Sequence, residues 1–146
     1  MEKVTVLFVC VHNSARSQIA EALLKNIGGD IFQVESAGIE PGELNPLAVE
    51  IMKEENIDIS SNKTKSVFEF YRQGKLFNYV IAVCDEVSAQ QCPIFPGFSV
   101  RLNWSLEDPA SFTGTYEERL EKIRTIKDRI KAYVIEFIDM VKCKTE

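Results

Sequence analysis

A cysteine and an arginine near the start of the chain are spaced for chemistry on an oxyanion. Cys10 and Arg16 are separated by five residues, namely Val11, His12, Asn13, Ser14 and Ala15. A thiolate is a strong nucleophile, and a guanidinium can donate two parallel hydrogen bonds to a tetrahedral oxyanion. The small residues Asn13, Ser14 and Ala15 allow a tight loop, and Asn13 tolerates a left-handed backbone. We therefore expect residues 10–16 to bind an oxyanion around a nucleophilic Cys10.

The elements on either side of this loop favour that interpretation. Residues 4–9 are β-branched and aromatic with little alternation, which predicts a strand buried on both faces. Residues 17–27 carry apolar side chains at helical spacing and precede a glycine pair. A loop between such a strand and helix directs backbone N–H groups at one point, where they hold an anion and stabilise the Cys10 thiolate. Ser17 is placed to donate a hydrogen bond to that thiolate. The plainer alternative is a buried strand-end cysteine beside a surface arginine.

The rest of the chain alternates predicted strands and helices. Strands are predicted over 31–36 and 77–83, with an edge strand over 99–104, and helices over 46–56, 65–73 and 116–141. In the helix over 65–73 we expect Val67, Phe68 and Tyr71 to point inward. This order predicts the α/β class with a mostly parallel sheet of about four strands. No repeat or linker divides residues 1–146, which predicts a single domain.

Composition excludes several classes of protein. With 17 Lys and Arg against 22 Asp and Glu, the 146-residue chain has a net charge of −5, which argues against a broad nucleic-acid-binding surface. No apolar run approaches the roughly 20 residues that span a bilayer, and the first residues lack the features of a secretory signal. We expect a cytoplasmic monomer with no membrane partner. Four cysteines without a Cys-x2-Cys pair, and a single histidine, argue against a zinc site, so we expect no metal and no cofactor.

Residues 9–22, with the sequence VCVHNSARSQIAEA, resemble the low-molecular-weight phosphatase superfamily, and within it the thioredoxin-coupled arsenate reductases. The resemblance continues in order through nearly the whole chain, at Ser36-Ala37-Gly38-Ile39, Asn45-Pro46, Ile57-Asp58-Ile59-Ser60, Val83-Cys84, Cys92-Pro93 and Trp104 to Ala110. It implies a four-stranded parallel sheet flanked by helices on both faces, in agreement with the elements predicted above.

Two further cysteines distinguish the arsenate reductases of this superfamily from its phosphatases. Cys84 ends a predicted strand, as Cys10 does; if those strands are adjacent and parallel, they lie about 4.8 Å apart, within the usual Cα separation of a disulfide. Cys92 can reach Cys84 if residues 85–91 rearrange. The resemblance implies a relay in which Cys10 attacks arsenate, Cys84 attacks the Cys10 adduct and releases arsenite, Cys92 attacks Cys84, and thioredoxin reduces the Cys84–Cys92 disulfide. A phosphatase, which hydrolyses its phosphocysteine with water, needs no such pair.

Asp108-Pro109 resembles the acid loop of the superfamily. Asp108 would protonate the oxygen that leaves when Cys10 attacks. Ala110 follows where tyrosine phosphatases of this superfamily usually carry an aromatic residue, which suits a small inorganic oxyanion. The leading hypothesis is thus an arsenate reductase recycled by thioredoxin. The alternatives are a low-molecular-weight phosphatase and a non-enzymatic thiol redox sensor or oxyanion-binding regulator.

The remaining polar residues receive smaller roles. Asn13, Glu21 and Ser36 match positions that support a potassium ion in some relatives, but Lys65 stands at the fourth position, where its ammonium would replace the cation. We expect His12 to support the loop structurally. Cys143 is expected to be incidental, in a tail after the last helix.

Overall fold

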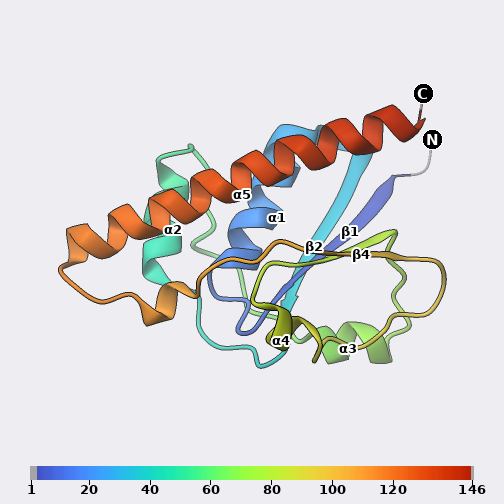
Figure 1. Ribbon diagram of the computed structural model, residues 1–146, viewed down its shortest axis with the longest axis horizontal. Coiled ribbons are helices and arrows are strands. Elements are labelled where there is room, and N and C mark those ends of the chain that lie inside the picture. Colours follow the sequence, from blue (N-terminus) through green and yellow to red (C-terminus); the bar gives the residue numbers. More distant parts are fainter. Residues whose placement is uncertain (1–2, 146) are drawn as a thin grey trace.

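The computed structural model describes residues 3–145 and centres on a parallel sheet (Figure 1). The strands are β1 (Val4–Cys10), β2 (Phe32–Gly38), β3 (Tyr79–Ala82) and β4 (Val100–Asn103), in the order β2-β1-β3-β4, and all three pairings are parallel. β1 and β3 are therefore neighbours, with Val9 opposite Ala82. Their carboxyl ends lie at the same edge of the sheet.

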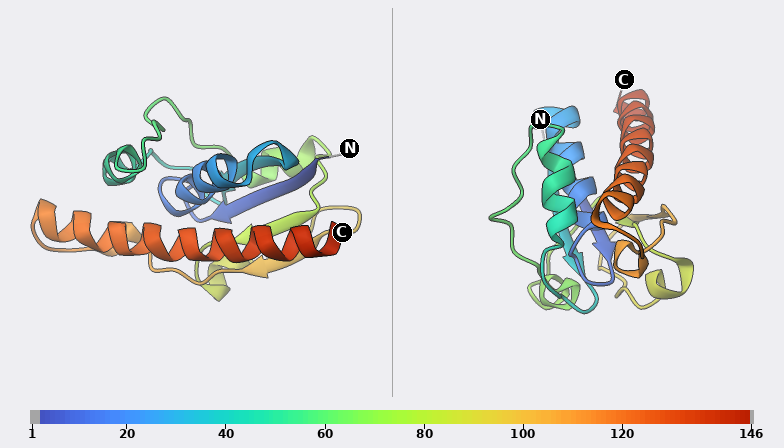
Figure 2. Two further views of the ribbon diagram at one scale, coloured as in Figure 1. Left: turned by 90° about the horizontal axis from the view of Figure 1, so that it is seen from above. Right: turned by 90° about the vertical axis from the view of Figure 1, so that its left-hand side faces the viewer.

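Helices cover both faces of this sheet, as predicted (Figures 1 and 2). On one face lie α1 (Arg16–Gly28), α2 (Pro46–Lys53) and the long α5 (Tyr116–Thr145), which packs against both of the others. On the other side lie α3 (Val67–Arg72) and the single turn α4 (Glu86–Ala89). Two short 3-10 helices, η1 (Gly29–Ile31) and η2 (Pro109–Ser111), complete the regular structure.

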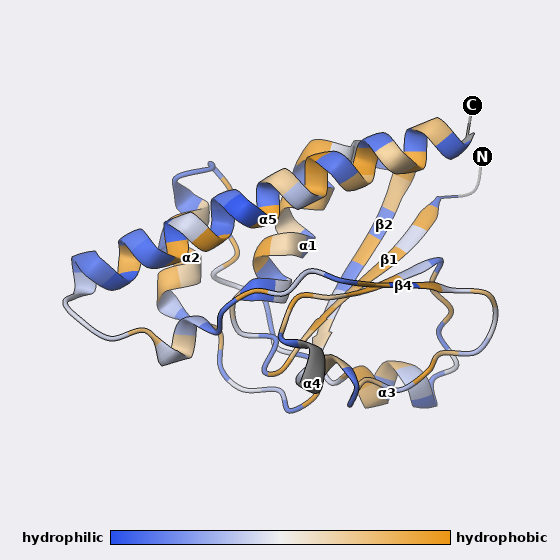
Figure 3. Cartoon of the chain, viewed as in Figure 1, coloured by the Kyte–Doolittle hydropathy of each residue, from blue (hydrophilic) through white to orange (hydrophobic). Residues whose placement is uncertain are grey.

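Alternate residues of β1 divide the core between these two layers. Val6, Phe8 and Cys10 belong to the core beneath α1, α2 and α5. Leu7 and Val9 belong to a second core formed with α3 and the segment that holds Cys92. α5 closes the first core with one apolar stripe, beside which Lys127 is also buried, and most of its hydrophilic residues lie on other sides of the helix (Figure 3). The fold class predicted from the sequence is confirmed.

Several predicted boundaries were wrong. The helix predicted over 46–56 ends at Lys53. The N–H groups of residues 54–56 bond to carbonyls three residues back, as in turns, and Asn56 is left-handed with φ 61°. The helix predicted over 65–73 spans only Val67–Arg72. With that start, positions three apart face the sheet, so Val67 and Phe70 are buried while Phe68 and Tyr71 are 37% and 46% exposed.

At the end of the chain, Cys143 lies within α5 rather than in a tail after it, because α5 continues to Thr145. None of the helices among residues 3–145 is both long enough and apolar enough to cross a membrane. Residues 1, 2 and 146 of the predicted domain lie outside the described residues.

Candidate active site

The loop after β1 is held from outside through its carbonyl groups. Segment 39–45 supplies four N–H donors, from Ile39, Glu40, Gly42 and Asn45 to the carbonyls of Cys10, Val11, His12 and Ser14, at 2.8–3.1 Å. The Asn13 carbonyl accepts a hydrogen bond from Gln18 Nε2 at 3.2 Å. In a planar trans peptide the N–H points opposite to the C=O, so the N–H groups of residues 11–15 turn toward the other side. This is the arrangement that an anion-binding loop requires, and residues 10–16 are called the anion-binding loop below.

Cys10 Sγ lies beside one of these backbone N–H groups. The Asn13 N–H donates to it at 3.1 Å, and Ser17 Oγ lies 2.9 Å from it. Both groups can donate to a thiolate, so Cys10 has the surroundings of a nucleophile, and the predicted contact with Ser17 is present. His12 Nδ1 donates to the Glu40 carbonyl at 2.9 Å, which is consistent with the structural role expected for it.

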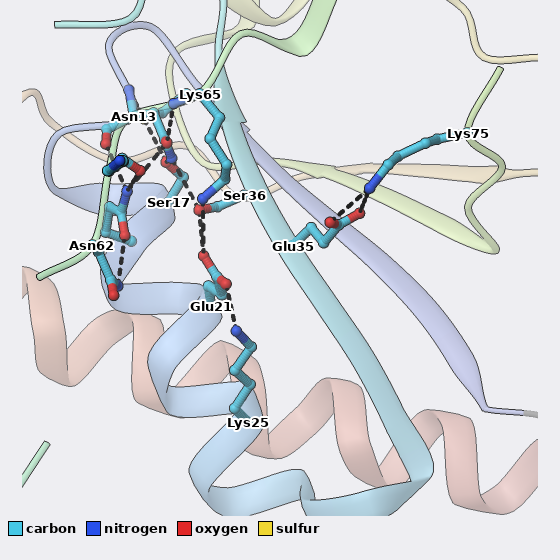
Figure 4. Close-up of polar contacts among 12 residues, drawn as sticks. Asn13, Ser17, Glu21, Lys25, Glu35, Ser36, Asn62, Lys65 and Lys75 are labelled. Atoms are coloured by element: carbon cyan, nitrogen blue, oxygen red, sulfur yellow. Dashed lines mark hydrogen bonds and ion pairs between the residues drawn. The ribbon is translucent and has the colours of Figure 1, made fainter. Parts of the chain in front are cut away.

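Asn13 connects the loop to three other segments. Its backbone has φ 54°, the left-handed conformation that its residue type predicts. Its Nδ2 donates to Ser17 Oγ at 2.7 Å and to Ser36 Oγ at 3.0 Å, while its Oδ1 accepts from the Lys65 N–H at 3.0 Å (Figure 4). Because the side chain is fully buried, these bonds fix the position of the loop relative to α1 and β2.

The same network ends in a buried carboxylate. Ser36 Oγ donates to Glu21 Oε1 at 2.5 Å, and Lys25 Nζ lies 2.6 Å from Glu21 Oε2 (Figure 4). Lys65 Nζ lies 4.0 Å from Glu21 Oε1. The side chain expected to replace a potassium ion is thus directed at this carboxylate. Across residues 3–145, no group of three or more His, Cys, Asp and Glu side chains is arranged to hold a metal ion.

Arg16 joins the anion-binding loop to the predicted acid. Its side chain is buried; Nη1 donates to the Leu106 carbonyl at 3.1 Å, and Nη2 lies 3.9 Å from Asp108 Oδ1. Asp108 caps η2 by accepting the Ala110 N–H at 3.0 Å, and its side chain is partly exposed. The guanidinium at the start of α1 and the carboxyl group therefore lie close together.

The three candidate relay cysteines are all buried free thiols. Cys84 follows β3 and shares a core with Cys10, whereas Cys92 packs in the core on the α3 side of the sheet. Burial raises the pKa of Cys84 to about 11; the Arg16 guanidinium opposes this, while the charges of Cys10 and Cys92 add to it. Burial also raises the pKa of Cys92 to about 11. Cys143 is exposed on α5.

Two residues that support the loop were not singled out by sequence reasoning. A Cβ at Gly38 would lie 2.8 Å from backbone atoms of the loop, so only glycine allows β2 to approach it this closely. Gln18, fully buried, donates to the Asn13 carbonyl and to Asn13 Oδ1. In the sequence, Gly38 is indicated by the run of small residues that ends β2, and Gln18 by its polar side chain within an apolar helix pattern.

Comparison with known proteins gives a consistent result. The model of the low molecular weight phosphotyrosine protein phosphatase family matches residues 5–146. An arsenate reductase of Bacillus subtilis is 38% identical over 142 residues, covering 95% of this chain and 98% of the relative. A solved arsenate reductase in its oxidized state superposes with a TM-score of 0.78 at 30% identity, over 94% of this chain and 98% of that chain. A thioredoxin-dependent arsenate reductase of Corynebacterium glutamicum gives a TM-score of 0.67 at 34% identity, over 96% of this chain and 64% of that one.

Proposed function

The chain belongs to the low molecular weight phosphotyrosine protein phosphatase family, and we propose that within it the protein is an arsenate reductase with a Cys10–Cys84–Cys92 relay. The full-length similarity to proteins named arsenate reductase supports the substrate. The similarity to a thioredoxin-dependent relative supports thioredoxin as the reductant.

The first step is attack of the Cys10 thiolate on the arsenic of arsenate. A sulfur–arsenic bond forms and an arsenic–oxygen bond breaks; the leaving oxygen takes a proton from the Asp108 carboxyl and departs as water. The N–H groups of residues 11–15 and the Arg16 guanidinium hold the remaining oxygens. The Arg16 guanidinium already lies 3.9 Å from Asp108 Oδ1.

The second step moves two electrons to arsenic. Cys84 attacks the Cys10 sulfur, a Cys10–Cys84 disulfide forms, and the sulfur–arsenic electron pair stays on arsenic, which leaves as arsenite. Cys92 then attacks Cys84 and releases the Cys10 thiolate. A thioredoxin dithiol reduces the resulting Cys84–Cys92 disulfide and returns the enzyme to its starting state.

The adjacency of β1 and β3 carries this proposal. Val9 lies opposite Ala82, and the Val83 N–H donates to the Val9 carbonyl at 2.8 Å, so Cys10 and Cys84 leave neighbouring strands at the same edge. A reductase uses two further thiols, and Cys84 and Cys92 are both buried free thiols. They have no part in a reaction that water completes.

Arsenate-dependent oxidation of NADPH, coupled through thioredoxin and thioredoxin reductase, tests the proposal. Cys84→Ser and Cys92→Ser should stop multiple turnovers while sparing slow hydrolysis of p-nitrophenyl phosphate. In single turnovers, Cys92→Ser should still release arsenite and Cys84→Ser should release none. Cys143→Ser is the matched control, since its thiol is exposed and distant in the chain, and should turn over normally.

Two results would overturn the proposal. Continued turnover of arsenate by Cys84→Ser would exclude the relay as written. No arsenate-dependent rate in the parent enzyme, beside rapid hydrolysis of phosphotyrosine, would identify a phosphatase instead.

We also propose that the chain acts as a single-domain, cytoplasmic monomer. A relay that starts from reduced thiols requires a compartment where thioredoxin keeps cysteines reduced, and this supports the cytoplasm.

A further inference from the structure

Cys92 shares a small cavity with an arginine. Its side chain is 5% exposed and lines a cavity of about 140 Å³ between the sheet and the segment after β3. Arg101, on the edge strand β4, lines the same cavity. The other lining residues are apolar except Asn103, so the guanidinium is the cationic group of this cavity.

One carbonyl group connects Arg101 to the backbone of Cys92. Ala89 is the last residue of α4, and its carbonyl accepts the Cys92 N–H at 3.2 Å and Arg101 Nη2 at 3.3 Å. The two donors fix the turn that carries Cys92 relative to β4. In the proposed relay Cys92 must reach Cys84, which lies in the other core, so residues 85–91 must rearrange.

The surroundings of Cys92 otherwise favour its neutral form. Its thiol donates to the Pro93 carbonyl at 3.5 Å, and burial raises its pKa to about 11, opposed by Arg101. Among the side chains that the structure describes, Arg101 from β4 is the charged group that acts on Cys92 directly. Cys92 also interacts with Cys84 at the end of β3, and Cys84 is in turn influenced by Arg16 and Cys10 from the loop after β1 and by Asp85 before α4. Compensation for a Cys92 thiolate therefore comes from Arg101.

We propose that Arg101 is the positioning residue of Cys92: it holds the Cys92 turn in the resting enzyme and stabilises the thiolate that attacks Cys84. The inference rests on the proposed relay. In this step the Cys92–Cys84 bond forms, the Cys84–Cys10 bond breaks, and Cys10 leaves as a thiolate, so no further oxidant or reductant is needed. Arg101 has no part in arsenate binding or in the release of arsenite.

Rapid-quench alkylation in a Cys143→Ser background separates the two steps. Released arsenite reports formation of the Cys10–Cys84 disulfide, and mass mapping of disulfides reports its transfer to Cys84–Cys92. Arg101→Gln removes the charge and has an N–H donor on a shorter side chain, whereas Arg101→Lys keeps the charge. Arg72→Gln, at another exposed arginine on α3, is the control.

We expect Arg101→Gln to leave arsenite release unchanged and to slow the transfer. For each unit by which the pKa of Cys92 rises, the rate at neutral pH should fall about threefold, because a tenfold loss of thiolate is partly offset by its greater nucleophilicity. The midpoint of the pH–rate profile should rise by as many pH units as the pKa of Cys92 rises. Arg101→Lys and Arg72→Gln should retain the parent rate and profile.

Equal slowing by Arg101→Gln and Arg101→Lys, with an unshifted pH profile, would overturn the inference and leave Arg101 a purely structural role. An unchanged transfer rate in Arg101→Gln would also overturn it. Absence of arsenite from the parent enzyme is a different result: it would refute the proposed function, and the inference with it.

Discussion

Replacing Gly38, the last residue of β2, by alanine would test how tightly the anion-binding loop is held. A Cβ at this position would lie 2.8 Å from the Asn13 nitrogen, the His12 carbonyl carbon and the Val11 oxygen, all of them backbone atoms. On its other side, the Gly38 N–H donates to the Lys65 carbonyl at 2.8 Å. The end of β2 is therefore bonded on both sides, and Gly38→Ala must displace the loop.

The size of the effect follows from these distances. Non-bonded carbon atoms prefer separations of about 3.5–4.0 Å, so the contact is too short by most of an ångström. Overpacking of this kind costs about 1–3 kcal/mol, and each kcal/mol lowers the melting temperature of a domain of this size by about 2–4 °C. Because a misplacement of about 1 Å can cost roughly 100-fold in rate, we expect kcat/KM to fall by about 10-fold to 100-fold.

Urea unfolding gives the free energy, and hydrolysis of p-nitrophenyl phosphate reports the loop without the relay. Gly42→Ala is the matched control: its added Cβ would lie 3.5 Å from His12 Cβ, an ordinary contact with the same loop. We expect that control to stay within about 0.5 kcal/mol of the parent. If Gly38→Ala proves as stable and as active as Gly42→Ala, the close approach of β2 does not constrain the loop.

Three further predictions concern single groups of the site. Asp108→Asn keeps an acceptor for the Ala110 N–H but cannot donate the proton, so kcat for p-nitrophenyl phosphate should fall by about 10²–10⁴ with little change in melting temperature. An unchanged kcat would show that Asp108 is not the general acid. Burial raises the pKa of Cys84 to about 11, so its thiolate fraction grows about tenfold per pH unit below that value. Arsenite release at saturating arsenate should therefore rise about tenfold per pH unit between pH 7 and 9. A rapid-quench rate that does not change with pH would contradict this. Because the Lys65 ammonium is directed at Glu21, the parent protein should have the same melting temperature in potassium chloride and in sodium chloride. Lys65→Asp should have a higher melting temperature in potassium chloride than in sodium chloride. A parent protein whose melting temperature depends on potassium would show that the ammonium does not replace the cation.

The sequence was most informative where function depends on neighbouring residues. The loop from Cys10 to Arg16, the left-handed Asn13 and the contact of Ser17 with Cys10 are all set within eight residues. Local spacing and residue type therefore predicted them. The supports of the loop come from elsewhere: segment 39–45 satisfies its carbonyls, and Gly38 admits the neighbouring strand. Those contacts depend on the pairing of β2 with β1, which local patterns do not encode.

Which face of a helix or strand is buried was harder to predict than the presence of the helix or strand itself. The short helix near residue 70 was expected, yet its inward residues depend on where its first turn begins, and a start at Val67 selects Phe70 over Tyr71. The same limit applies to Cys92. A spacing of eight residues from Cys84 allows the chain to pass around the carboxyl edge of the sheet, and the structure places the two thiols in different cores.

That separation, together with burial, gives a physical reason for the order of the proposed relay. Cys10 has the Asn13 N–H and Ser17 Oγ at its sulfur, so it is prepared to meet the oxyanion first. Cys84 and Cys92 are neutral at pH 7, because burial raises the pKa of each to about 11, and a neutral thiol is a poor nucleophile. Cys84 lies in the core of Cys10 and follows the strand beside it, whereas Cys92 needs a rearrangement of its turn. In the proposed relay Cys92 therefore needs a movement that Cys84 does not, and this requirement would oppose premature formation of the Cys84–Cys92 disulfide.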